Sequence, residues 1–231
     1  MHGLKLLCSA KWVIIAALMM TISCGSCEDV RRVTTDTLQQ NEYRVRRAIL
    51  SNTVRIICDG GSGSGTLAYQ NLVITAYHVV SSNDDGHQID IFDSENNLSQ
   101  GWVVAYGDPV NDIAVLQRPD TTVNGSRRWY GWGHDISEGS KVYVGGHPWG
   151  MTAGILTDGY ICSVASDSSY FWISANALPG SSGSGVYTAD GMYIGTLVRG
   201  MVRFGTWSQF TFHAIPITRM TTRFDRLNLD N

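Results

Sequence analysis

The sequence predicts an all-β domain in which short antiparallel strands form barrels or a sandwich. From Thr53 onward, short apolar or alternating runs recur, and clusters of Gly, Asn, Asp and Ser separate them. Hydrophobic residues occupy 43% of the 231 positions and charged residues 16%, which fits a packed core rather than a disordered chain. Regularly spaced strands of this kind are typical of antiparallel barrels and sandwiches.

Residues 1–27 have the features of a targeting segment. Lys5 and Lys11 give a basic start, the run 12–22 is apolar, and small residues follow it. The apolar run is shorter than the roughly 20 residues that span a bilayer. We therefore expect a signal peptide, or a lipoprotein or membrane-anchor leader, and we favour export with cleavage. The protein would then be periplasmic, secreted or membrane-anchored.

The cysteines leave two questions open. Cys24 lies where a bacterial lipoprotein signal carries its lipidated cysteine, so it is a candidate for lipidation and for a membrane tether; the alternative is an incidental thiol in a cleaved leader. Cys58 and Cys162, in the predicted domain, could form a disulfide after export or stay as buried free thiols. No C-x-x-C metal spacing occurs and the histidines are scattered, so we expect no metal site and no cofactor.

Residues 28–51 predict a polar linker that runs into a short helix, capped near Thr35 or Asp36. The arginine-rich run 44–47 could contact anionic lipid if the chain is anchored. A solvated helix face is the simpler interpretation.

The domain that follows, residues 52–231, divides into two halves. The first half, at about 52–118, contains the strand-like runs 53–58, 65–69, 72–75, 88–92, 102–106 and 113–117. The second half, at about 139–218, contains the runs 141–144, 154–164, 170–174, 185–188, 192–199 and 210–215. The segment 118–138 is rich in Gly and Asn and has no long apolar run, so we place the crossover between the halves there.

A candidate nucleophile lies in Gly180-Ser181-Ser182-Gly183, which has the pattern Gly-x-Ser-Gly. Gly180 permits an unusual turn, and the amides of Gly180 and Ser182 could then point at one place as an oxyanion hole. Ser181 and Ser184 fit this role less well, because neither has glycine both two positions before it and directly after it. A structural Gly/Ser-rich turn is the alternative.

A candidate base and a candidate carboxylate precede this serine. His78 follows an apolar strand and a small pair of residues, so its imidazole would be both rigid and accessible. Asp112 precedes an apolar strand, and a buried carboxylate needs a partner such as His78. An alcohol needs an imidazole to take its proton, and the imidazole needs a carboxylate to fix its tautomer. His147 precedes Pro148, and this pair is more typical of a turn.

These residues resemble the trypsin-like serine protease superfamily, and most closely its HtrA/Deg-type branch. Residues 75–79 match the family setting T-A-x-H-V, and residues 108–116 match D-P-x-x-D-I-A-V-L. Residues 179–184 are similar to P-G-N-S-G-G, residues 146–150 to G-N-P-F-G, and residues 213–216 to F-A-I-P. The blocks keep the family's order, and the resemblance extends roughly from Thr53 to Arg223.

The resemblance implies two six-stranded antiparallel β-barrels with the active site between them. It implies a catalytic triad of His78, Asp112 and Ser182 with an oxyanion hole at Gly180 and Ser182. It also implies a substrate pocket lined by Asn176, Leu197, Val198, Arg199, Gly200 and His213. The pocket has no obvious acidic floor, so Lys/Arg specificity is not expected. A preference for acidic or for small aliphatic residues stays open.

The sequence departs from the family pattern in three respects. Ser181 and Ser184 replace the usual Asn and Gly, but Gly-x-Ser-Gly remains, so we expect the oxyanion hole to form. No PDZ module follows the domain, which puts family-style regulated oligomers in doubt. No Ile-Val-Gly-Gly terminus occurs, so we do not expect activation by the zymogen switch of digestive proteases.

We therefore predict a serine endopeptidase that acts on protein or peptide substrates. A non-catalytic peptide-binding module on the same scaffold is the alternative. A membrane-tethered structural protein is a third interpretation, supported only by the leader and the basic segment after it. The net charge of −3 does not indicate nucleic-acid binding, and the sequence leaves the oligomeric state open.

Overall fold

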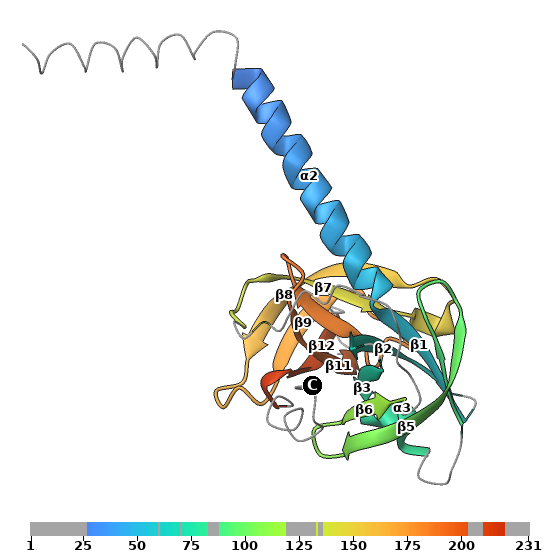
Figure 1. The fold of residues 1–231 in the computed structure, drawn as a ribbon. Coiled ribbons are helices and arrows are strands. Elements are labelled where there is room, and N and C mark those ends of the chain that lie inside the picture. The colour runs from blue at the N-terminus through green and yellow to red at the C-terminus, as the bar shows by residue number, and fades with distance from the viewer. Residues whose placement is uncertain are drawn as a thin grey trace, which may run out of the picture. The chain divides into compact units, whose positions relative to one another are not determined.

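Two closed antiparallel barrels form the main body of the chain (Figure 1). The structure is a computed structural model that describes residues 27–59, 61–69, 71–82, 88–118, 133, 136–202 and 210–219. The barrels lie in one compact unit that begins at Val45, and residues up to Arg44 belong to a separate unit. The predicted all-β class and the two six-stranded barrels are confirmed.

The first barrel has the strand order β1-β2-β3-β6-β5-β4. Its strands are β1 (Thr53–Cys58), β2 (Gly61–Tyr69), β3 (Leu72–Ala76), β4 (Ile89–Phe92), β5 (Leu98–Asp108) and β6 (Ile113–Gln117). A short helix, α3 (Tyr77–Val80), follows β3 directly. Because β3 pairs with β6 with Ala76 opposite Ile113, the residues that follow β3 and precede β6 meet at one end of the barrel.

The second barrel has the strand order β10-β11-β12-β9-β8-β7. Its strands are β7 (Lys141–Gly146), β8 (Ile155–Val164), β9 (Phe171–Ala175), β10 (Gly185–Thr188), β11 (Tyr193–Val202) and β12 (Phe210–Pro216). A 3-10 turn, η2 (Pro148–Gly150), follows β7. Each of these twelve strands overlaps a run that the sequence predicts, so apolar or alternating runs and the turn residues between them located the strands.

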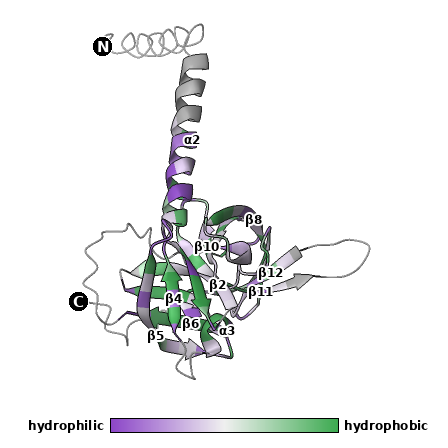
Figure 2. Cartoon of the chain, turned by 90° about the vertical axis from the view of Figure 1, so that its right-hand side faces the viewer, coloured by the Kyte–Doolittle hydropathy of each residue, from purple (hydrophilic) through white to green (hydrophobic). Residues whose placement is uncertain are grey.

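Three clusters of buried side chains form the cores of the two barrels and the contact between them. One fills the first barrel around Ile56, Val73 and Leu116, and another fills the second around Val144, Phe171 and Ile194. Figure 2 shows hydrophobic residues along the strands of the first barrel. The third cluster joins the barrels, because it contains Ile74, Ala76 and Ile113 of the first with Tyr143, Tyr187, Val198 and Ile215 of the second. Burial of apolar surface between the barrels therefore fixes the two halves of the site against each other.

The short helix expected after residue 35 is wrong in extent, because α2 runs over Cys27–Ser51. No glycine or proline interrupts this stretch of the sequence, so no residue in it breaks a helix. Figure 2 shows mostly hydrophilic residues along the coloured part of α2. Val45 and Ile49, near its end, are buried in the cluster between the barrels.

The arginine-rich run 44–47 is not simply a solvated face. Arg46 Nη1 lies 2.8 Å from Asp158 Oδ1, and its guanidinium lies 5.1 Å from the centre of the Tyr143 ring. Lys141 Nζ approaches the same carboxylate at 3.3 Å. Burial acts to raise the pKa of Asp158, but the hydrogen bonds from Arg46 and Lys141 outweigh it and hold that pKa below its ordinary value. These contacts attach the last turns of α2 to β7 and β8.

The disulfide considered for Cys58 and Cys162 is contradicted, because both are free thiols. Cys58 is buried inside the first barrel, whereas Cys162 is exposed on β8 of the second. The predicted leader, including Cys24, and most of the predicted crossover lie outside the described residues. Within the described part of the chain, no helix has both the length and the apolar character needed to cross a membrane.

Candidate active site

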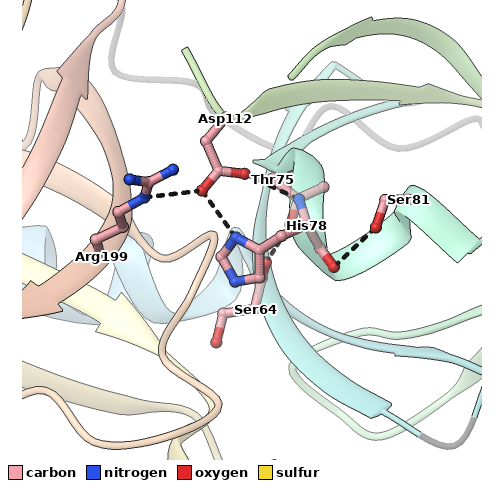
Figure 3. Close-up of polar contacts among 6 residues, drawn as sticks. All are labelled: Ser64, Thr75, His78, Ser81, Asp112 and Arg199. Carbon is pink, nitrogen blue, oxygen red and sulfur yellow. Dashed lines mark hydrogen bonds and ion pairs between the residues drawn. The ribbon is translucent and has the colours of Figure 1, made fainter. Parts of the chain in front are cut away.

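His78 and Asp112 form a hydrogen-bonded pair at the end of the first barrel (Figure 3). His78 Nδ1 lies 2.8 Å from Asp112 Oδ2, so this ring nitrogen carries a proton that it donates to the carboxylate. The backbone amide of His78 donates to Asp112 Oδ1 at 2.9 Å. Asp112 is only 6% exposed, and these two bonds give each of its buried carboxylate oxygens a partner. The pair that the sequence predicts is present.

The local turn before β6 explains why Asp112 reaches His78. Asp108 Oδ1 accepts the amides of Val110 and Asn111, both at 3.0 Å, which closes a tight turn after β5. Asp112 follows this turn with a φ of 57°, a left-handed conformation that aspartate tolerates better than most residues. Its carbonyl accepts the amide of Tyr77 at 3.0 Å. Asp112 thus supplies acceptors to two amides in the first turn of α3, which has no side-chain cap of its own.

The candidate nucleophile Ser182 lies in a glycine-dependent loop between β9 and β10. Gly180 has a φ of 90°, and Gly183 has a φ of 87°. A Cβ at Gly183 would lie 2.0 Å from the carbonyl oxygen of Ser64, so no other residue fits there without moving the backbone. The carbonyl of Ser182 accepts the amide of Ser64 at 2.8 Å. The loop of the second barrel is therefore attached directly to the first.

The two serines that depart from the family pattern are accommodated. Ser181 closes the turn with Leu178: its amide donates to the Leu178 carbonyl at 2.9 Å, and its hydroxyl accepts the Leu178 amide at 3.2 Å. Ser184 is fully buried, and a Cβ at Gly146 would lie 1.9 Å from its hydroxyl oxygen. Glycine at position 146 thus provides the room that Ser184 needs.

The amides of Gly180 and Ser182 make no hydrogen bond to any described residue. Neighbouring amides in the same loop do have partners, since Gly183 donates to the Leu197 carbonyl at 2.7 Å and Ser184 donates to Ser181 at 3.0 Å. Backbone N–H groups without protein partners are suited to bind a carbonyl oxygen of a ligand. An oxyanion hole requires amides without protein partners.

A cavity of about 280 Å³ opens beside Ser182. Leu197, Val198, Arg199 and Gly200 line it, as the sequence predicts. Ala177 and Phe212 also line it, whereas Asn176 and His213 are not among its described lining residues. Which residues contact a substrate stays a prediction. Side chains alternate across a strand, so Phe212 faces the cavity while His213 packs on the other face against Tyr170 and Trp172.

A second hollow of about 420 Å³ contains His78 and Asp112. It shares the wall formed by residues 198–200 with the cavity beside Ser182, so the serine and the His–Asp pair border adjoining spaces. Within the described structure, the Ser182 hydroxyl makes no hydrogen bond to His78. Catalytic hydrogen bonds of this kind are often long without substrate and shorten in the complex.

Ser64 is a residue of the site that the sequence analysis missed. It is fully buried on β2, and its hydroxyl donates to the carbonyl of Gly180 at 2.8 Å and accepts the amide of His147 at 2.7 Å. One hydroxyl of the first barrel thus fixes two loops of the second. The glycine-serine repeat at 61–65 resembles a flexible turn in the sequence, and its partners lie far along the chain.

His147 stands directly before the turn η2, as the sequence predicts, and its side chain is fully buried. Its Nδ1–H donates to the carbonyl of Met151 at 2.9 Å. Burial lowers the pKa of His147, and the nearby positive charge of Arg55 acts in the same direction. Among the described residues, no group of His, Cys, Asp and Glu side chains is arranged to hold a metal ion.

The chain belongs to the family of trypsin-like peptidases, because the family model for the trypsin-like peptidase domain matches residues 63–195, more than half of its length. This segment contains His78, Asp112 and Ser182. The family acts on proteins or peptides by hydrolysis, and the superfamily predicted from the sequence motifs is confirmed. A search of curated proteins finds no match.

Solved structures of serine proteases share this fold. The serine endoprotease from Yersinia pestis matches with a TM-score of 0.62 and 19% identity over 80% of this chain, which spans 66% of the Yersinia chain. Deg5 matches with the same TM-score and identity over 80% of this chain and 92% of that chain. At this identity the similarity is one of fold.

Proposed function

We propose that the chain is a serine endopeptidase that hydrolyses peptide bonds through an acyl-enzyme intermediate on Ser182. The observation that carries the proposal is the short bond between His78 and Asp112 beside a cavity that Ser182 lines. Membership of the trypsin-like peptidase family supports it.

The proposed reaction begins with attack of Ser182 Oγ on the scissile carbonyl. His78 accepts the hydroxyl proton at Nε2 and later donates it to the leaving amine. Asp112 keeps the proton on Nδ1, which leaves Nε2 free to act as the base, and it stabilises the imidazolium that forms. Water then attacks the acyl-enzyme with His78 again as base, and the peptide carboxylate is released.

The amides of Gly180 and Ser182 bind the oxyanion of the tetrahedral intermediate in this proposal. Neither amide has a hydrogen-bond partner among the described residues, and this supports the role because each is available to a ligand. Removal of one such donor costs about 3 kcal/mol of transition-state stabilisation in comparable sites. The cavity beside Ser182 receives the side chain on the acyl side of the scissile bond.

Hydrolysis of unfolded casein by the purified chain and by Ser182→Ala tests the proposal. We expect the variant to keep the wild-type circular dichroism spectrum and to lose nearly all turnover, since the nucleophile is removed without a change in packing. Ser169→Ala serves as the matched control, because Ser169 is a partly exposed serine that, among the described residues, lines neither hollow and hydrogen-bonds to Asp167. This variant should cleave casein at the wild-type rate. A Ser182→Ala protein with wild-type activity would exclude Ser182 as the nucleophile.

Export remains a prediction from the leader at residues 1–27. We propose that the protein acts outside the cytoplasm, either free or attached through its N-terminal region. Fractionation of cells that express the full chain, with an antibody to the barrel domain, would test this localisation.

A further inference from the structure

Arg199 is a cation at the boundary between the two hollows of the site. It lies on β11 and lines both the cavity beside Ser182 and the hollow that contains His78 and Asp112. Its Nε lies 3.9 Å from Asp112 Oδ2, and Figure 3 shows that it approaches this oxygen from the side opposite His78. The side chain is 69% exposed, so most of the guanidinium remains accessible to a ligand.

The surroundings of Arg199 make it the main charge that a bound peptide meets. The other described residues that line the cavity beside Ser182 are Ala177, Leu178, Pro179, Ser181, Ser182, Leu197, Val198, Gly200 and Phe212, none of them charged. In the adjoining hollow, Asp112 is the one carboxylate among the described lining residues, and it already accepts a hydrogen bond from His78. His213 on β12 pairs directly with Arg199, so the two side chains lie on the same face of the sheet. The His213 ring packs against Tyr170 and Trp172, and burial together with the positive charge of Arg199 lowers its pKa.

Arg199 does not use its full bonding capacity on Asp112. The distance of 3.9 Å is too long for a hydrogen bond, so the two groups form only a loose ion pair. The guanidinium has five N–H donors and favours planar carboxylates, which it binds with two parallel hydrogen bonds. A carboxylate on a substrate could therefore bind Arg199 without displacing the bond between Asp112 and His78.

We propose that Arg199 is a specificity-determining residue that selects peptides with a glutamate or aspartate side chain at, or next to, the residue held beside Ser182. This inference rests on the proposed peptidase function. It adds a substrate class, because the apolar lining of the cavity alone would favour uncharged side chains.

Matched peptide pairs test this proposal. Each pair carries Glu or Gln at one position on the acyl side of the scissile bond, so the members differ in charge and hardly in shape. For the wild type we expect kcat/KM to be about threefold to tenfold higher for the Glu peptide at one of these positions. The ratio should fall as salt is raised from 0.05 M to 0.5 M, because added ions screen an exposed pair.

Variants of Arg199 separate recognition from structure. In Arg199→Gln the Glu/Gln ratio should fall to about one, and in Arg199→Lys part of it should remain, because lysine keeps the charge but not the planar donor set. Arg219→Gln is the control, since Arg219 is also an exposed arginine in an ion pair, with Asp167, and does not line either hollow. It should keep the wild-type ratio.

Three results would overturn the proposal: no Glu preference in the wild type at any position, a preference that Arg199→Gln keeps, or an equal loss of activity toward both peptides in Arg199→Gln. The salt series requires no variant, so it stands even if a variant folds poorly. If the wild type cleaves none of the peptides and does not cleave casein, the peptidase function itself fails. Cleavage without charge preference refutes only the role of Arg199.

Discussion

At the scale of single residues, His147 has a buried imidazole whose protonation is energetically unfavourable. Burial lowers the pKa of His147 by more than its backbone hydrogen bonds to Met151 and Thr53 raise it. A proton on Nε2 would place a positive charge in the interior, near Arg55. The carbonyl of His147 also lies close to Gly180, within 3.0 Å of the place where a Cβ of Gly180 would stand.

We predict that His147 makes the protein less stable in mild acid. Burial lowers its pKa in the folded state, so the unfolded chain binds the proton more readily, and the contribution of His147 to stability is complete above about pH 6.5 and is lost as the pH falls below that value. Urea unfolding at pH 7.5 and pH 5 should show a smaller decrease in the free energy of unfolding for His147→Asn than for the wild type. His213→Asn is the comparison variant. Burial also lowers the pKa of His213, but its side chain is only half-buried. The decrease in the free energy of unfolding between pH 7.5 and pH 5 should therefore stay closer to the wild-type value in His213→Asn than in His147→Asn. An unchanged or larger decrease for His147→Asn would contradict this account.

At the scale of elements, the end of α2 is a part of the barrel unit. Ile49 is 1% exposed among residues of both barrels, and its carbonyl accepts the hydroxyl of Thr53 at 3.0 Å. Leu38, on the same helix, is 70% exposed. The two positions therefore differ in burial although both carry a four-carbon aliphatic side chain.

We predict that Ile49→Ala lowers the free energy of unfolding by about 2–5 kcal/mol, because it leaves a cavity between the barrels. Leu38→Ala should change it by no more than about 0.5 kcal/mol. Denaturant unfolding of the two variants under identical conditions measures both values. Equal effects at the two positions would mean that the end of α2 does not pack on the barrels as described.

The strands could be predicted from the sequence, and the helix could not be predicted in full. Short apolar runs bounded by turn residues located strands such as β6 and β10 to the residue, because such strands are buried along nearly their whole length. Helix α2 has few apolar residues before Val45, so its period was too weak to show where it begins. The sequence does not show which residues of β12 face the cavity, because the face depends on the strand register; Phe212 is among the described lining residues and His213 is not.

At the scale of the whole molecule, the site depends on contacts between barrels that the sequence does not reveal. His78 and Asp112 could be predicted because each has a local motif. Ser64 could not, because its partners Gly180 and His147 are 116 and 83 residues away. A second hydroxyl, that of Thr66, also joins the barrels, through a buried hydrogen bond of 3.2 Å to Tyr187.

We predict that Ser64→Ala reduces both stability and turnover. The loss of its hydroxyl leaves the Gly180 carbonyl and the His147 amide without their shared partner, which costs about 1–3 kcal/mol. Because the loop that carries Gly180 is then less fixed, kcat should fall about tenfold or more. Thr66→Val removes a comparable buried bond away from the loop, so it should lower stability but keep kcat within about twofold of the wild type. Equal kcat values for the two variants would contradict a positioning role for Ser64.

The two barrels together bring a hydroxyl, an imidazole and a carboxylate to adjoining spaces, and covalent labelling tests whether they act as a unit. The folded protein is treated with a fluorophosphonate probe, and the modified residue is identified by mass spectrometry. We predict that the probe modifies Ser182, and that His78→Ala abolishes the modification in a protein that still folds. No labelling of the folded wild type, or labelling of another serine, would contradict the proposed active site, and the former result would favour a peptide-binding module without catalysis.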